Sequence, residues 1–63
     1  MPVVQVHIKD GKTIEQRRAI VARITDVLVE VCGSTRQNVH VIINEVEQDK
    51  WGRGGALLSD LEG

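Results

Sequence analysis

Proline at position two is the residue whose type and place could do chemistry. Pro2 follows Met1 directly, and a small second residue normally permits removal of the initiator methionine, so we expect Pro2 to be the mature N-terminus. A free N-terminal proline is a secondary amine. An unperturbed α-amino group has a pKa of about 7.7–8.0, which falls when the amine is desolvated or lies beside cations. Such an amine is suited to act as a general base, or as a nucleophile that forms an iminium ion with a carbonyl.

Pro2 also has a purely structural interpretation. A proline at the start of an edge strand loses no hydrogen bond that the sheet needs. On position alone this interpretation is the simpler one, so the choice depends on the elements that surround Pro2.

Those elements are predicted to be a strand, a helix and a second strand. Val3–Ile8 alternates β-branched residues between two faces, which is typical of a strand. After a turn, Thr13 is suited to be a helix N-cap, with Gln16 completing a capping box. Apolar residues then recur at helical spacing as far as Gly33, a good C-terminal cap, which predicts a helix over residues 14–32. Residues 39–46 alternate again and predict the second strand.

A strand, a long helix and a strand form a β-α-β unit, so the two strands should be parallel with a right-handed crossover. The expected fold class is α+β, with residues 1–63 forming a single domain. The tail carries a glycine-dense stretch, Trp51–Gly55, which predicts a C-terminal turn or hairpin. One helix covers one face of a two-stranded sheet, yet both faces carry apolar residues, so we expect other copies of the chain to supply the missing cover.

Composition excludes several classes of partner. The 63 residues carry eight Lys and Arg against nine Asp and Glu, a net charge of −1, and a single aromatic residue. A nucleic-acid binder normally has a basic domain and aromatic side chains that stack on bases. No apolar run approaches the roughly 20 residues of a membrane span, and the N-terminus lacks the features of a signal peptide. We therefore expect a cytoplasmic protein that binds neither nucleic acid nor membranes.

The single cysteine, Cys32, has no partner for an internal disulfide. Its place at the end of the helix favours a small buried residue over a nucleophile, and a free thiol fits a reducing compartment. No group of residues has metal-ligand spacing, and His7 and His40 lie too far apart in the pattern to form a metal pair. We expect neither metal nor cofactor, and a chain this short with no covalent reinforcement should self-associate.

The ordered combination of short segments resembles the 4-oxalocrotonate tautomerase family over essentially the whole chain. The segments are Met1-Pro2, Gly11 followed by a basic residue, Glu15-Gln16-Arg17, Val41-Ile42-Ile43-Asn44-Glu45 and Trp51-Gly52-Arg53-Gly54-Gly55. The resemblance implies an isomerase made of β-α-β subunits that pair into dimers and assemble as a hexamer, with a role in the breakdown of aromatic compounds. It also implies that Pro2 is a general base that becomes the general acid as it moves a proton within an enol or unsaturated keto acid.

The supporting positions depart from the best-known members of that family. Lys12 stands where an arginine usually grips a carboxylate, and it keeps the charge but loses the two-pronged geometry. His40 replaces a second arginine, and a neutral imidazole donates one hydrogen bond without a fixed charge. Trp51 keeps the aromatic wall that is commonly phenylalanine. Arg53 is an addition with two interpretations. It is either a solvated residue of the tail, or a cation that makes the contact with the substrate carboxylate that is lost where His40 replaces an arginine.

Three functions remain open at this point. The first is a cofactor-independent tautomerase for 2-hydroxydienoates or enols of keto acids, with a leaning toward a monoacid or an atypical diacid because both arginines are changed. The second is haloacrylate dehalogenation by addition of water, which is disfavoured because the tail position where relatives carry an activating carboxylate holds Arg53. The third is a weakly active assembly subunit of a hetero-oligomer, which the changes at Lys12 and His40 favour and the retained Pro2 opposes.

Overall fold

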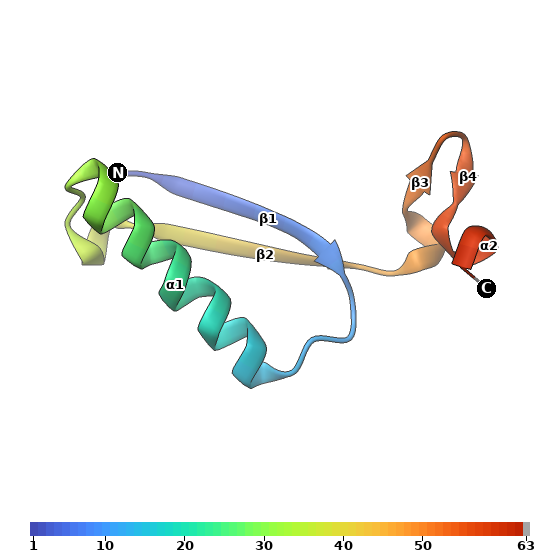
Figure 1. The fold of residues 1–63 in the computed structure, drawn as a ribbon, viewed down its shortest axis with the longest axis horizontal. Helices are drawn as coiled ribbons and strands as arrows, with labels where there is room; N and C mark the ends of the chain where they lie inside the picture. The colour runs from blue at the N-terminus through green and yellow to red at the C-terminus, as the bar shows by residue number, and fades with distance from the viewer. Residues whose placement is uncertain (63) are drawn as a thin grey trace.

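The computed structural model describes residues 1–62 as a β-α-β unit followed by a small tail (Figure 1). β1 (Val3–Lys9) and β2 (His40–Val46) lie parallel, with Val3 beside His40 at one end and Lys9 beside Val46 at the other. The parallel pairing confirms the predicted topology. Each strand differs by one residue from its predicted bounds: Lys9 joins β1, and β2 begins at His40. Val39 instead closes the short 3-10 helix η1 (Arg36–Asn38), because its N–H donates to the carbonyl of Arg36.

α1 (Ile14–Cys32) begins and ends where its capping residues predict. The Thr13 hydroxyl accepts from the Gln16 N–H at 3.1 Å, and the Gln16 side-chain oxygen accepts from the Thr13 N–H at 2.9 Å. This reciprocal pair satisfies two donors that the first helical turn leaves free. At the other end Gly33 has φ 70°, a left-handed conformation in which its N–H returns to the carbonyl of Val29. No helix within residues 1–62 is both long and apolar enough to cross a membrane.

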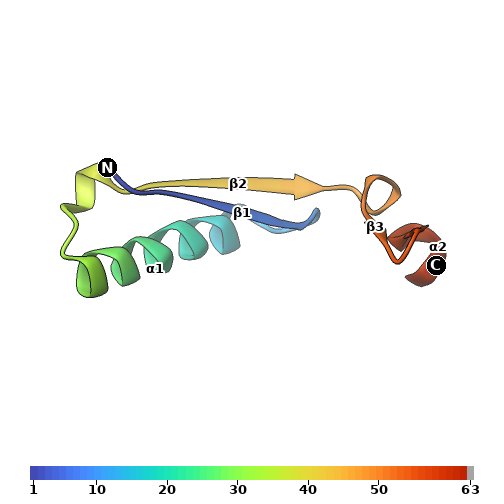
Figure 2. The same ribbon diagram turned by 90° about the horizontal axis from the view of Figure 1, so that it is seen from above.

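α1 covers one face of the β1–β2 sheet and leaves the other open (Figure 2). Side chains of the covered face are half-buried, whereas those of the open face are exposed. The covered face carries Val4, Val6, Ile8, Val41 and Ile43, and the open face carries Val3, Gln5, His7, His40, Ile42 and Asn44. The alternation predicted from the sequence therefore holds, and the open face of a single chain keeps apolar side chains in solvent.

Little of the apolar surface is buried within one chain. Among the described residues only Leu58 is fully buried, with 5% of its surface exposed. Val27 and Val31, which belong to the apolar pattern of α1, are 53% and 78% exposed. The expectation that Cys32 is buried is wrong for the single chain: this residue ends α1 next to Val31, and its side chain is exposed. Cover by other copies remains a prediction.

The tail contains the predicted hairpin together with two short helices that the sequence pattern did not indicate. η2 (Gln48–Lys50) leads into β3 (Gly52–Arg53), which pairs antiparallel with β4 (Ala56–Leu57), and α2 (Leu58–Glu62) follows. The turn is made by Gly54 and Gly55 at φ 61° and 87°, a pair of positive values that a tight hairpin turn needs and that glycine adopts without strain. The hairpin stands beyond the end of the sheet that lies away from the N-terminus (Figure 1).

The N-cap of α1 supplies a test of this architecture. Thr13→Ala should lower the free energy of unfolding by about 1 kcal/mol, because it removes the hydroxyl that accepts from Gln16. Thr35→Ala is the matched control, since Thr35 precedes η1 without making a side-chain cap, and it should cost less than about 0.5 kcal/mol. The measurement is denaturant unfolding of both variants at one protein concentration. Equal losses would show that the Thr13 cap does not stabilise the fold.

Candidate active site

Pro2 and His40 lie together at the end of the sheet where β1 and β2 both begin. The His40 N–H donates to the carbonyl oxygen of Pro2 at 3.0 Å, which extends the parallel ladder by one bond. Pro2 is half-buried and precedes β1, so its ring is held by sheet structure. His40 is exposed, and its side chain lies on the open face beside that of Val3. The structure thus brings the backbones of these two predicted site residues together, while the strand alternation places the Pro2 ring on the face that α1 covers and the His40 imidazole on the open face.

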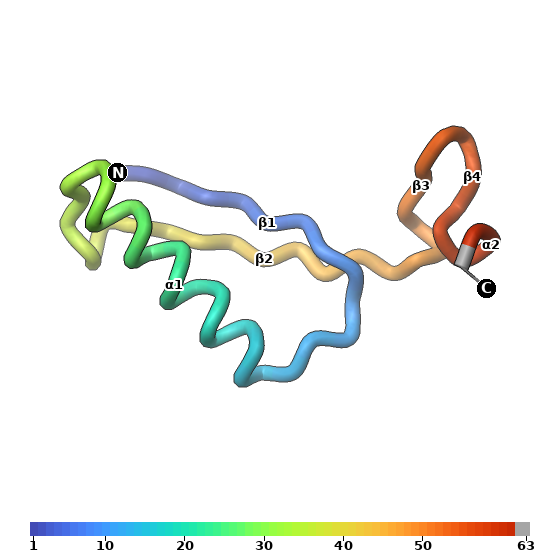
Figure 3. The backbone as a smooth tube through the Cα atoms, viewed as in Figure 1, coloured from blue at the N-terminus to red at the C-terminus, as the bar shows by residue number. Residues whose placement is uncertain are grey.

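Lys12 lies at the opposite end of β1. The chain runs along the whole of β1 before it reaches the loop between β1 and α1, and Lys12 lies in that loop (Figure 3). The seven residues of β1 rise about 3.3 Å each, which separates Pro2 from Lys12 by roughly 20 Å or more. Pro2 and Lys12 of one chain therefore cannot contact the same small molecule.

Trp51 and Arg53 lie in the tail hairpin, beyond the Lys12 end of the sheet. The carbonyl of Trp51 accepts from the Leu58 N–H at 2.8 Å, which places Trp51 just before β3 in extended conformation. Residues two apart in an extended segment share a face, so Trp51 and Arg53 point to the same side of the hairpin. Trp51 is half-buried and Arg53 is exposed, with no ion pair to another described side chain. The hairpin therefore presents an aromatic surface beside a cation.

The predicted site residues thus form separate groups within one chain: Pro2 with His40, Trp51 with Arg53, and Lys12 in its loop. No pocket lies within the described part of a single chain. Across residues 1–62, no three His, Cys, Asp or Glu side chains are close enough to hold a metal ion. A complete site containing all three groups requires more than one copy of the chain.

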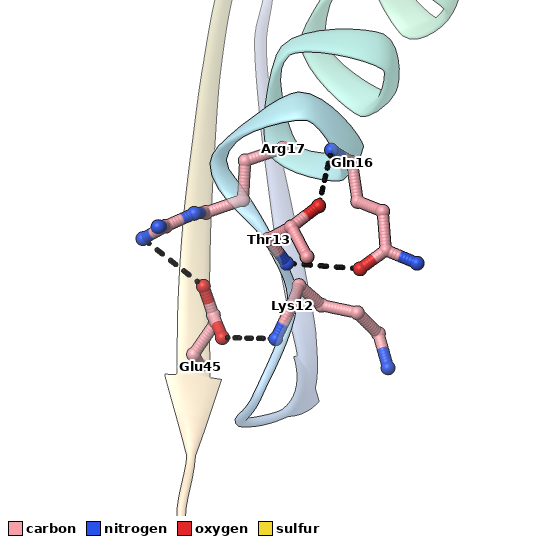
Figure 4. Close-up of polar contacts among 5 residues, drawn as sticks. All are labelled: Lys12, Thr13, Gln16, Arg17 and Glu45. Carbon is pink, nitrogen blue, oxygen red and sulfur yellow. Dashed lines mark hydrogen bonds and ion pairs between the residues drawn. The ribbon is translucent and has the colours of Figure 1, made fainter.

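Glu45 is a residue whose part in this region the sequence analysis missed, because there it stood only as the last residue of a segment that resembles the family. It pairs with Ile8 on the face of the sheet that α1 covers, and its side chain is only 18% exposed. Its carboxylate accepts from the Lys12 N–H at 3.2 Å and lies 3.3 Å from the Arg17 guanidinium (Figure 4). The available signal was the strand alternation, which places this charged residue on the apolar face after Val41 and Ile43.

Comparison with known proteins identifies the family. A family model described as a tautomerase enzyme matches residues 2–61, nearly the whole chain. The chain belongs to the tautomerase family. A relative from Dickeya dadantii, named probable tautomerase K2, is 43% identical over 61 residues, with 95% of this chain and 91% of the relative covered. A 2-hydroxymuconate tautomerase of Comamonas testosteroni is 34% identical over 61 residues, with 97% of each chain covered.

Solved structures agree with this family. A structure from work on the 4-oxalocrotonate tautomerase isozymes of Methylibium petroleiphilum superimposes with a TM-score of 0.89 at 35% identity, covering 95% of this tautomerase and 97% of that chain. The resemblance inferred from the short segments is confirmed, as is the small β-α-β fold. Tautomerases are isomerases, so the predicted enzyme class is also confirmed at the level of the family.

Proposed function

We propose that this tautomerase, in a mature form that starts at Pro2, converts 2-hydroxydienoate or enol forms of keto acids to their keto or conjugated isomers without a cofactor. The observation that carries the proposal is the half-buried Pro2 at the start of β1, in a chain whose family match begins at residue 2. Similarity to a 2-hydroxymuconate tautomerase supports the substrate class. We also propose a cytoplasmic location, because a single cysteine forms no internal disulfide and a free thiol fits a reducing compartment.

The reaction needs only a base that returns the proton it takes. The lone pair of the Pro2 amine removes a proton from one position of the substrate, and the resulting ammonium delivers that proton to a carbon at another position of the conjugated system. No electrons are gained or lost, so the chemistry balances without an oxidant or reductant. While Met1 is attached, the nitrogen of Pro2 belongs to an amide and has no basic lone pair, which makes removal of Met1 essential to this mechanism.

The other groups bind the substrate. The Lys12 ammonium attracts a substrate carboxylate, and the His40 imidazole donates a hydrogen bond to the keto oxygen. Trp51 supplies an apolar wall against which the carbon skeleton of the substrate packs. Arg53 offers a planar guanidinium to a second carboxylate, or to the single carboxylate of a monoacid. With Lys12 and His40 in place of arginines, we expect monoacid enols to be accepted at least as well as 2-hydroxymuconate.

These groups meet only if several copies assemble, and we propose a homo-oligomer of dimers that form a hexamer. The open face of the sheet supports this, because it presents Val3 at 55% and Ile42 at 46% exposure in the single chain. Val27 and Val31 on α1 add further apolar surface. Removal of apolar surface from water is favourable by about 25 cal/mol per Å² before the entropic cost of association, and a second copy of the chain presents the same exposed residues in return.

The N-terminal amine is tested by mass and kinetics on one sample. The intact mass should be short by one methionine. Pro2→Ala should reduce kcat toward phenylenolpyruvate or 2-hydroxymuconate about a hundredfold, because the amine of alanine lacks the ring that fixes the direction of the nitrogen lone pair, and a positioned general base contributes about that much. Both proteins keep a free α-amine, so the comparison isolates the ring amine.

A retained methionine together with absent turnover would reject the tautomerase mechanism. That outcome would favour the alternative of an assembly subunit in a hetero-oligomer, for which the replacement of both arginines is the supporting observation. Water addition to a haloacrylate, with tautomerase activity absent, would favour the dehalogenase alternative.

Arg53 is tested by its removal. Arg53→Ala should raise KM for an accepted keto acid about tenfold with a smaller change in kcat, because the variant cannot make a charge-assisted hydrogen bond to the substrate carboxylate. Arg23→Ala, at an exposed position of α1, is the matched control and should leave both constants unchanged. Unchanged KM and kcat for Arg53→Ala would show that Arg53 is a solvated residue of the tail.

A further inference from the structure

Glu45 connects β2 to the loop that carries Lys12. The two residues are 33 positions apart, and one carboxylate oxygen of Glu45 accepts from the Lys12 backbone N–H at 3.2 Å. The N-cap of α1 follows at once, because the next residue is Thr13. Lys12 precedes the helix, so its N–H receives no partner from the helical ladder, and the carboxylate of Glu45 provides one.

The loop before Lys12 is held on both sides of Gly11. Gly11 has φ 99°, a backbone conformation that glycine adopts without strain, and a Cβ added there would meet no atom within 4 Å, so the position needs glycine for its φ and not for a close contact. On one side of Gly11 the Asp10 N–H donates to the carbonyl of Val46 at 3.1 Å. On the other side the Glu45 carboxylate holds Lys12. A backbone–backbone bond on one side of Gly11 and a bond from a backbone N–H to a side chain on the other therefore hold this loop.

The charge of Glu45 is directed away from the Lys12 side chain. The second carboxylate oxygen of Glu45 lies 3.3 Å from the guanidinium of Arg17, whose side chain is 44% exposed. The Lys12 ammonium points away from Glu45 and has no partner among the described side chains (Figure 4). Glu45 thus holds the backbone of Lys12 while the negative charge of Glu45 is paired with Arg17. The Lys12 ammonium stays available to an anion.

We propose that Glu45 is a positioning residue for Lys12: it sets the place and direction from which the Lys12 ammonium reaches the substrate carboxylate. This rests on the proposed function, in which Lys12 binds that carboxylate. The Lys12 ammonium is a point charge on a flexible four-carbon side chain, without the planar geometry of arginine. A firmly held Lys12 backbone therefore limits the region that the ammonium can reach. This role is distinct from a general contribution to the stability of the fold, because Glu45 acts on substrate binding only through Lys12.

A double-mutant cycle tests this. Lys12→Met should raise KM for a keto acid about tenfold, and Glu45→Ala should raise it about fivefold with kcat little changed. In the Lys12→Met background, Glu45→Ala should add less than about a twofold further rise, because there is no ammonium left to position. Glu45→Gln keeps an oxygen that accepts from the Lys12 N–H, so its KM should stay within about threefold of the parent. Size-exclusion chromatography checks the assembly of each variant.

Asp26→Ala is the matched control. Asp26 also forms an ion pair between two elements, with Arg36 of η1, but it lies far along α1 from Lys12. Its loss should leave KM unchanged.

Multiplicative effects of Glu45→Ala and Lys12→Met would overturn the proposal and leave the function intact. If Glu45→Ala fails to assemble, Glu45→Gln replaces it in the same cycle. A rise in KM caused by Glu45→Gln that is equally large in the Lys12→Met background contradicts the proposal. If Pro2→Ala retains full activity, the proposed function itself fails, which is a separate result.

Discussion

A two-stranded parallel sheet with a helix on one face cannot enclose its own apolar side chains, and this constraint governs the rest of the molecule. α1 half-buries the side chains of Val4, Val6 and Val41 but leaves the opposite face in solvent. Full burial within one chain is confined, among the described residues, to Leu58 in the tail. A small chain that leaves this much apolar surface exposed gains stability from association rather than from folding alone.

The same geometry spreads the candidate site along the chain. A parallel pair places the starts of both strands at one end, which brings Pro2 to His40. The loop after β1 necessarily lies at the other end, and with it Lys12. The tail continues beyond that end and carries Trp51 and Arg53 on a separate hairpin. In the proposed oligomer association and catalysis are therefore linked, because Pro2 and Lys12 of one chain lie too far apart to contact the same small molecule.

Local patterns predicted most of the fold. Alternation in the strands, the Thr13 capping box and the positive φ of Gly33 depend on neighbours within a few residues, which the sequence displays directly. The short helix α2 was not predicted, because its five residues are too few to show a helical period. The exposure of Cys32 was also missed, since the apolar pattern of α1 does not separate a face that meets the sheet from one that faces solvent.

The candidate site was only partly accessible from sequence. The chemistry of a terminal amine indicated Pro2, the family resemblance indicated the positions of Lys12, His40 and Trp51, and Arg53 was singled out as a departure from the family. Their distribution over both ends of the sheet follows from the strand register and is seen only in the fold. The contact between Glu45 and Lys12 spans 33 positions and joins a side chain to a backbone N–H, which no local pattern reveals. A charged residue on the covered face of β2 was the sole local sign of it.

A site shared between copies of the chain is tested by the activity of a mixture of two defective variants. Pro2→Ala and Lys12→Met proteins would be unfolded together in equal amounts, refolded, and assayed well below KM beside each variant refolded alone. If each site takes Pro2 and Lys12 from different copies, random assembly restores about one quarter of the sites, and activity should rise well above the mean of the two variants. Activity no greater than that mean would show that both residues act from the same chain, which contradicts a site shared between copies.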